Sequence, residues 1–338
     1  SRSSGHMTPH AQEMSTHATS KGSWQGIIED LGLQYDYLTS AYIERGDLRK
    51  GGVRLLVLPY AQALSDRETA EIRAFAEAGG CVLADLRAAT FTTSGQPLAR
   101  GALDTLFGIG RRQERALPVA GPLKIEGLTP EPFTLNGFRA DASVTTGTAR
   151  AFGELAGAPA LLVNTAGKGQ AMLLNLAPMA YDFLLGRNEL GEGRAAFRAL
   201  LAKAGVQARF AARSTDGREI PGVEFAVFRR GNADYLTVEK RSFAYERYPL
   251  PAEITLGAPY WVSDVRTGRS LGRTDRIPLQ LDGLGCYLFA LLPYEVKGLA
   301  VKAPASVKRG GDIVLEVALT ADAAPADLAP PGSRIARW

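Results

Sequence analysis

The stretch VRLLVLPYAQALSDRETAEIRAFAEAGGCVLAD, residues 53–85, decides the fold. It contains two predicted strands, 55–59 and 81–85, whose continuous apolar residues are typical of strands covered on both faces and therefore of parallel sheets; only Asp85, at the end of the second, is charged. Between them, Ser65 and Glu68 have the spacing of a helix capping box, and two glycines supply a left-handed stop. Strand, helix and strand with short loops form a right-handed crossover unit, which predicts an α/β fold: an open, mostly parallel sheet with helices on both faces.

Patterns on either side extend this unit into a larger domain. The spacing of Trp24, Ile27, Ile28 and Leu31 predicts a short helix that Ser23 caps. Residues 35–38 are predicted to form a short strand. The apolar runs 160–164 and 171–177, joined by a Gly-Lys-Gly turn, predict a hairpin that completes the sheet. A last helix with Phe197, Leu200, Leu201 and Ala204 on its buried face is expected to end at Gly205.

Changes of pattern along the chain predict its domain organisation. Residues 1–22 are interpreted as a flexible arm or tag, and 23–210 as the α/β domain, with an inserted excursion at about 111–150. From 211 to 296 the hydrophobic period becomes two, which predicts a small all-β, sandwich-like domain. Residues 297–338 then carry two further candidate strands, interpreted as the start of a truncated β-domain.

Composition narrows the class of protein. The chain has 338 residues, of which 46% are apolar and 22% charged, as in globular proteins. Its net charge of +4 is scattered along the sequence, so no nucleic-acid partner is expected. No apolar run approaches the roughly 18 residues that span a bilayer, so no membrane partner is expected. Because the first residue is Ser1, we interpret the chain as a fragment, and the sequence leaves its cellular compartment open.

The sequence lacks the motifs that are typical of common catalytic sites. No G-x-[SC]-x-G elbow occurs, and both Cys81 and Cys286 lie in apolar runs, which favours buried structural thiols. The three histidines, His6, His10 and His17, lie near the start of the chain, where a tag or arm is a simpler interpretation than a metal site. GIG at 108–110 follows no clear strand, which favours a turn over a dinucleotide fingerprint. We therefore expect no complete catalytic site, no metal and no cofactor.

One acidic residue has a suggestive position. Asp85 lies at the carboxyl end of a predicted parallel strand, where open α/β sheets bind ligands, and Arg87 follows two residues later. These two residues are the candidate ligand contacts, although an acidic residue in a loop more often serves as a turn or helix cap. Asp182, after a later strand, has a weaker claim.

Short motifs over residues 23–205 give the chain a family resemblance. They resemble the β-galactosidase trimerisation domain, a class I glutamine-amidotransferase-like α/β module of glycoside hydrolase family 42 and its relatives. The following segment, with VSDVRTG at 262–268, is similar to the small β-domain that often comes next in such proteins. The motifs that carry the first resemblance are YDYL at 35–38, IERGDL at 43–48, LLVLP at 55–59, LSD at 64–66 and LFGI at 106–109.

The resemblance implies a fold and a function. It implies an amidotransferase- or flavodoxin-like sheet without a catalytic triad, and a non-catalytic role in oligomerisation within a β-galactosidase-like glycoside hydrolase. The expected partners are further copies of the chain, as a trimer in the family, and an upstream catalytic barrel; carbohydrate contact is left open. The alternative is a stand-alone amidotransferase-like enzyme or small-ligand sensor that uses a crevice near Asp85.

Overall fold

The computed structural model describes residues 17–112, 118–128, 134–306, 309–310 and 316–322. The chain divides into two compact units. Unit 1 comprises the chain up to Ala208 together with Phe243–Glu246, and unit 2 comprises Arg209–Ser242 and the chain from Arg247 onward. Residues 1–16 of the expected arm lie outside the described residues.

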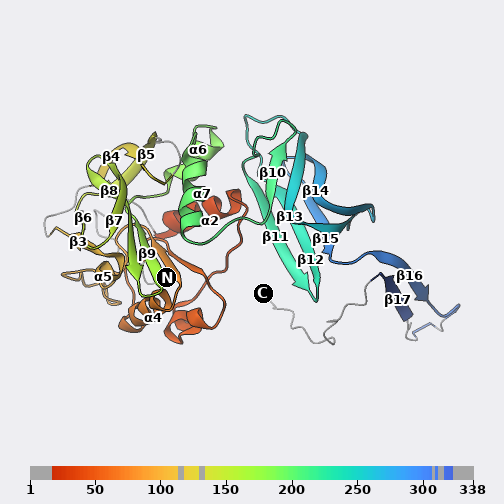
Figure 1. Cartoon of the computed structure of the whole chain (residues 1–338), viewed down its shortest axis with the longest axis horizontal. Coiled ribbons are helices and arrows are strands. Elements are labelled where there is room, and N and C mark those ends of the chain that lie inside the picture. Colours follow the sequence, from red (N-terminus) through yellow and green to blue (C-terminus); the bar gives the residue numbers. More distant parts are fainter. Residues whose placement is uncertain (1–16, 113–117, 129–133, 307–308, 311–315, 323–338) are drawn as a thin grey trace. The chain divides into compact units, whose positions relative to one another are not determined.

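Unit 1 is a mixed α/β structure (Figure 1). Its helices are α2 (His17–Asp30), α3 (Ser40–Glu44), the 3-10 helix η2 (Asp47–Arg49), α4 (Asp66–Glu77), α5 (Asp104–Phe107), α6 (Ala180–Gly186) and α7 (Gly193–Lys203). Its strands are β1 (Leu55–Leu58), β2 (Cys81–Ala84), β3 (Ile109–Arg111), β4 (Pro118–Lys124), β5 (Thr134–Asp141), β6 (Val144–Thr146), β7 (Arg150–Leu155), β8 (Ala158–Ala166) and β9 (Gly169–Leu174).

Seven of these strands form one sheet in the order β1-β2-β9-β8-β7-β4-β5, and β3 pairs with β6 separately. β1, β2 and β9 are parallel, whereas the other four pairings are antiparallel. The expectation of a mostly parallel sheet is therefore wrong, and the sheet is mixed. The physical reason is the short connections on either side of β8, because tight turns can join only antiparallel strands. The predicted 111–150 excursion contributes β4 and β5, which extend the sheet on the side away from β1.

The prediction of helices on both faces is confirmed by two separate cores. Alternate residues of the parallel strands point to opposite faces. Leu83 and Met172 join a core with Trp24 and Phe197 of the helices α2 and α7, while Val82 and Leu173 join a second core with residues of α3, α4 and α5.

Helix α4 forms where the sequence predicts it. The Ser65 hydroxyl accepts a hydrogen bond from the Glu68 amide at 3.0 Å, and the Glu68 carboxylate accepts one from the Ser65 amide at 2.7 Å. This reciprocal pair is the predicted capping box. After Ala78 the chain turns at Gly79, whose φ of 119° requires a residue without a side chain.

Helix α2 already includes residues 17–22, ahead of the start predicted at Ser23, so the interpretation of these residues as part of a flexible arm is wrong. Ser23 is not a cap; its hydroxyl donates to the Thr19 carbonyl inside the helix. Gly26 lies so close to α6 that a Cβ there would meet the Asp182 carboxylate at 2.4 Å. Tertiary contact, which local sequence patterns do not report, thus fixes this helix.

Three aromatic rings join the helices on the α2 side of the sheet. Phe197 of α7 packs edge-on against Trp24 and Tyr181, with ring centroids 6.2 and 5.1 Å apart. The Tyr181 hydroxyl donates to Asp30 at the end of α2 at 2.6 Å, and Arg194 of α7 pairs with the same carboxylate at 2.8 Å. Helices α2, α6 and α7 are therefore fixed to one another.

Unit 2 is built from antiparallel strands around its own core. β10 (Ala211–Ser214), β11 (Val223–Arg230), β12 (Ala233–Lys240), β13 (Leu250–Asp264), β14 (Ser270–Leu281) and β15 (Cys286–Leu292) form a six-stranded sheet. The sequence predicts this all-β character from the period of two, and Phe225, Leu236, Ile254 and Phe289 lie in its core.

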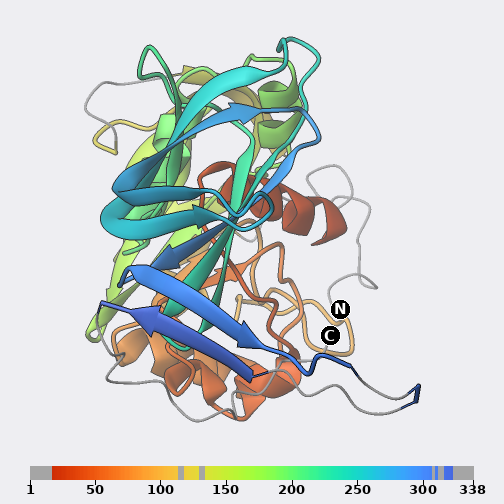
Figure 2. The ribbon, with the colours of Figure 1, turned by 90° about the vertical axis from the view of Figure 1, so that its right-hand side faces the viewer.

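β16 (Val296–Lys302) and β17 (Glu316–Ala321) form a separate two-stranded sheet (Figure 2). They correspond to the two candidate strands of the expected truncated domain, part of which lies outside the described residues. None of the helices in the described part of the chain has the length and apolar character needed to cross a bilayer.

Candidate functional site

The carboxyl ends of β1, β2 and β9 are where a ligand of an open α/β sheet is expected. Asp85 follows β2 there, but its side chain is only 1% exposed. Its carboxylate accepts hydrogen bonds from the Ser20 hydroxyl, from the Trp24 indole N–H at 3.1 Å and from the Tyr60 amide. The buried carboxylate therefore joins α2 to the ends of β1 and β2.

Burial also changes the acidity of this group. Desolvation raises the pKa of Asp85 to about 7, against the lowering effect of the Ser20, Tyr60 and Trp24 hydrogen bonds. Asp85 therefore changes charge near neutral pH inside the protein.

Arg87 takes part in a different cluster. Its guanidinium donates to the Asp141 carboxylate at 2.9 Å, and Arg111 lies 3.4 Å from the same carboxylate and 3.1 Å from Asp104. The two aspartates are each 1% exposed at the side chain, and the arginines 17% and 14%. These four residues form a buried ionic cluster that joins the segment after β2 to β5, α5 and β3.

The cluster keeps Asp141 ionised. Burial alone would raise its pKa, but Arg87, the Ser143 hydroxyl and amide, and Arg111 together hold the pKa of Asp141 below its usual value. The Ser143 hydroxyl and amide donate to this carboxylate at 2.7 and 2.9 Å.

The two predicted candidate residues are thus not brought together: each has its own partners within the chain. Sequence reasoning missed Ser20 and Trp24 as partners of Asp85, and Asp141 as the partner of Arg87. A ligand-contact role for Asp85 and Arg87 stays a prediction. The weaker candidate, Asp182, lies against Gly26 of α2.

The cysteines and histidines form no catalytic pair in the described part of the chain. Cys81 is buried, as predicted, and desolvation raises the pKa of its thiol to about 12. Cys286 is exposed, so its predicted burial is wrong; it begins β15, whose inward-facing residues are Phe289 and Leu291. His17 donates from Nδ1 to the Pro59 carbonyl at 2.9 Å, while His6 and His10 lie outside the described residues.

No group of three or more His, Cys, Asp or Glu side chains that could hold a metal ion occurs within the described ranges.

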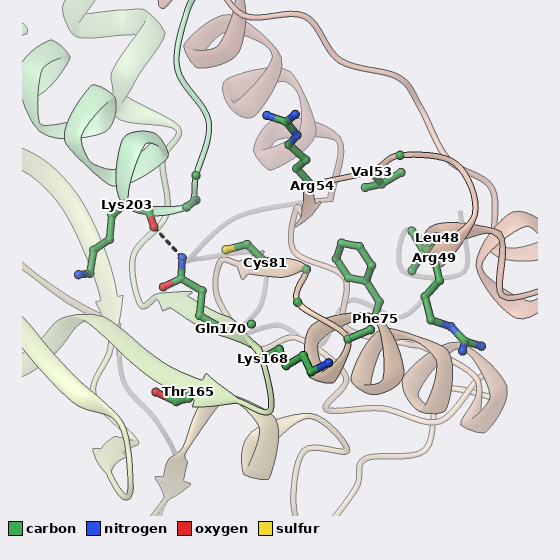
Figure 3. Close-up of a pocket in the computed structure, with 17 residues that line it drawn as sticks. Leu48, Arg49, Val53, Arg54, Phe75, Cys81, Thr165, Lys168, Gln170 and Lys203 are labelled. Carbon is green, nitrogen blue, oxygen red and sulfur yellow. Dashed lines mark hydrogen bonds between the residues drawn. The ribbon is translucent and has the colours of Figure 1, made fainter.

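A pocket of about 670 Å³ lies at the opposite end of the parallel strands (Figure 3). Arg49, Arg54, Lys168 and Lys203 line it, and no acidic side chain does. Gln170 donates to the Lys203 carbonyl at 2.6 Å, and the Lys203 side chain points away from Cys81 (Figure 3). The four basic side chains are exposed and come from four different segments, so this amino-end pocket offers positive charge without a fixed ligand cage.

A second cavity, of about 630 Å³, lies along β1, the outermost strand of the sheet. It is lined by β1 itself, by Trp24, Gln25 and Ile28 of α2, and by the irregular segment 33–38. This β1-edge groove contains neither Asp85 nor Arg87 in its wall.

One protein-family model matches residues 47–207. The match is to the β-galactosidase trimerisation domain. It confirms the resemblance drawn from the sequence, and it covers α4, the parallel strands β1, β2 and β9, and the helices α6 and α7. No curated protein matches the chain.

Solved structures show the same fold. The chain is similar to the β-galactosidase of Bacillus circulans sp. alkalophilus, with 15% identity, a TM-score of 0.62 and coverage of 82% of this chain and 38% of that one. The cold-adapted β-galactosidase of Rahnella sp. R3 gives 19% identity, a TM-score of 0.57 and coverage of 84% and 38%. The β-galactosidase of Halorubrum lacusprofundi has 18% identity, a TM-score of 0.53, and coverage of 83% of this chain and 36% of that one. The chain therefore spans less than two fifths of the length of these enzymes.

Proposed function

We propose that this chain is the non-catalytic, assembly-forming part of a β-galactosidase-like glycoside hydrolase. The observation that carries the proposal is the match of residues 47–207 to the trimerisation domain, together with the structural likeness over more than four fifths of the chain. The chain associates with two further copies of itself through unit 1.

Catalysis is assigned to a (β/α)8 barrel elsewhere in the parent protein. This proposal is supported by the small share, 36–38%, of the three compared β-galactosidases that the chain spans. Asp85 and Asp141 also support it, because their carboxylates bind groups of the chain itself: Asp85 accepts a hydrogen bond from Trp24, and Asp141 pairs with Arg87. In a barrel of this kind, two carboxylates at strand ends would perform the hydrolysis. Contact of this chain with carbohydrate stays a prediction.

Two finer features of the fold belong to the same proposal. The parallel strands β1, β2 and β9, with helices on both faces, support an amidotransferase-like origin for unit 1. The antiparallel sheet of unit 2 supports a sandwich-like accessory domain.

Helix α6 supplies a surface for self-association. Met179, which caps the start of α6, and Phe183 within it are 43% and 62% exposed, and the guanidinium of Arg187, which follows α6, lies over the Phe183 ring at 5.2 Å. Large apolar side chains that share an exposed helix face are typical of interfaces, and an aromatic ring bordered by arginine has the chemistry of an interface hot spot. The α6 surface also lies within the segment that matches the trimerisation domain.

We expect Phe183→Asp to weaken self-association at least about tenfold, because a carboxylate would be buried against an apolar partner surface. Sedimentation velocity over a dilution series measures this change. Leu284→Asp is the matched control, since Leu284 is 95% exposed in unit 2 and its replacement should leave association unchanged. Equal association of Phe183→Asp and the unmodified chain would exclude the α6 surface as the interface.

A further inference from the structure

The amino-end pocket carries positive charge that the chain itself only partly neutralises. Four basic side chains and no acidic one line it, although the chain as a whole has 39 Lys and Arg against 35 Asp and Glu. Arg49 pairs with Glu71 at 3.0 Å, and the Lys203 ammonium lies over an aromatic ring. Among the described residues, no carboxylate forms an ion pair with Arg54 or Lys168. These two charges are therefore open to a partner.

The helix ends beside the pocket do not account for these charges. Basic side chains at the carboxyl end of a helix often bind its last carbonyl groups. Here other donors fill that role: the Glu77 carbonyl of α4 accepts from the Lys168 amide at 3.0 Å, and the Lys203 carbonyl of α7 accepts from the Gln170 side chain at 2.6 Å. Two helix ends together contribute roughly one negative charge, so the pocket keeps an excess of positive charge.

Tertiary contacts fix the backbone that carries the two open charges. Lys168 lies in the turn between β8 and β9, and this turn packs tightly against the end of α4. A Cβ at Gly169 would lie 2.2 Å from the Gly80 carbonyl oxygen, so only glycine permits this close approach. The Arg54 carbonyl accepts from the Cys81 amide at 2.9 Å. The positive charges are therefore held at the amino ends of the parallel strands.

The opposite end of α7 carries the complementary charge. Helix α7 ends at the pocket with Lys203, and its 11 residues make it about 16 Å long at roughly 1.5 Å per residue. The acidic loop 187–192 precedes α7 and presents Glu189 and Glu192, both exposed. Glu189 pairs at 2.9 Å with Arg187, which is itself exposed. The Glu192 side chain neither caps α7 nor forms an ion pair with a described residue.

A closed trimer needs two different surfaces on each chain. Three copies around one axis make heterologous contacts, in which one surface of each chain meets another surface of the next. The acidic loop and the amino-end pocket cannot pair within one chain, because α7 separates them. Between two copies their opposite charges attract each other and set the orientation of the contact. Both surfaces also lie within residues 47–207, the segment that matches the trimerisation domain.

Building on the proposed trimer, we propose that the acidic loop 187–192 of one copy docks in the amino-end pocket of the next copy. Glu189 and Glu192 then face Arg54 and Lys168. The basic side chains of the pocket come from four segments, and that of Lys203 points away from Cys81 (Figure 3). Such spacing suits several carboxylates on a protein surface better than one small anion. Because the loop directly follows α6, this contact continues the apolar α6 surface.

Charge reversal at either end of the contact tests the proposal. We expect Glu192→Lys and Lys168→Glu each to weaken self-association of the full chain at least about tenfold, because like charges would then meet at every interface. Sedimentation velocity over a dilution series measures the change, and circular dichroism verifies that each variant folds. Lys302→Glu is the matched control, since Lys302 is exposed in β16 and its reversal should change association less than about threefold.

The chain that carries both Glu192→Lys and Lys168→Glu separates direct contact from local damage. Each interface of this double variant again joins opposite charges, so we expect it to regain most of the affinity that either single variant loses. A double variant that associates as weakly as the single variants would overturn the proposal. So would an unmodified trimer that neither single reversal weakens, although the proposed function would then stand. An unmodified chain that stays monomeric would overturn both.

Discussion

We expect the titration of Asp85 to lower the free energy of unfolding by roughly 4 kcal/mol between about pH 4 and pH 7. Burial raises the pKa of this carboxyl from 3.8 to about 7 in the folded chain, and one pKa unit corresponds to about 1.4 kcal/mol. Because the folded state holds the proton more tightly, the stabilising contribution is complete below the unfolded pKa. It is lost as the pH rises through the folded value.

Urea unfolding monitored by tryptophan fluorescence measures this effect, since the Trp24 indole donates to Asp85. The Asp85→Asn variant has no proton to release, so its stability relative to the unmodified chain should improve steadily from pH 4 to pH 8. Asp275→Asn is the control, because this carboxylate is exposed. A stability difference between Asp85→Asn and the unmodified chain that stays constant with pH would show that Asp85 is ionised throughout.

We expect replacement of Asp141 to lower the free energy of unfolding by about as much as the titration of Asp85. Asp141→Ala leaves the Arg87 guanidinium, 17% exposed, without its carboxylate and removes the acceptor of two Ser143 hydrogen bonds. Breaking a buried ion pair on one side typically costs about 3–5 kcal/mol, because the remaining charge is uncompensated. Denaturant unfolding at pH 7 measures the loss.

Asp216→Ala is the matched control for this prediction. Asp216 pairs with Arg218 at 2.7 Å, but both side chains are more than half exposed. Solvent screens such an exposed pair, so its loss should change the free energy of unfolding far less than the loss of the buried pair. Similar losses in Asp141→Ala and Asp216→Ala would contradict the structural role assigned to the buried cluster.

Elements with strong local signals could be predicted from the sequence. The capping box at Ser65 and the apolar run of β1 carry their own information, because capping and burial on both faces constrain residue types at short range. The direction of the outer strands could not be predicted, because it depends on how the 111–150 excursion returns to the sheet. Residues 17–22 carry no hydrophobic period, so the sequence pattern could not predict that they are helical. Their contacts with Asp85 and Pro59 come from distant parts of the chain.

The candidate site shows the same limit. The sequence correctly placed Asp85 after a parallel strand, a position that favours ligand binding in open sheets. It could not reveal that Ser20 and Trp24, more than 60 residues earlier, contact this carboxylate. Nor could it pair Arg87 with Asp141, 54 residues later. Residue type and strand position identify a candidate, but only the tertiary fold decides whether the side chain faces a ligand or its own chain.

The most direct test of the assembly role is the molar mass of the chain in solution, measured by sedimentation equilibrium over a range of concentrations. The proposed function predicts a species of three times the 36.1 kDa of one chain at micromolar concentration, which dissociates on dilution. A mass of one chain at every concentration would contradict it.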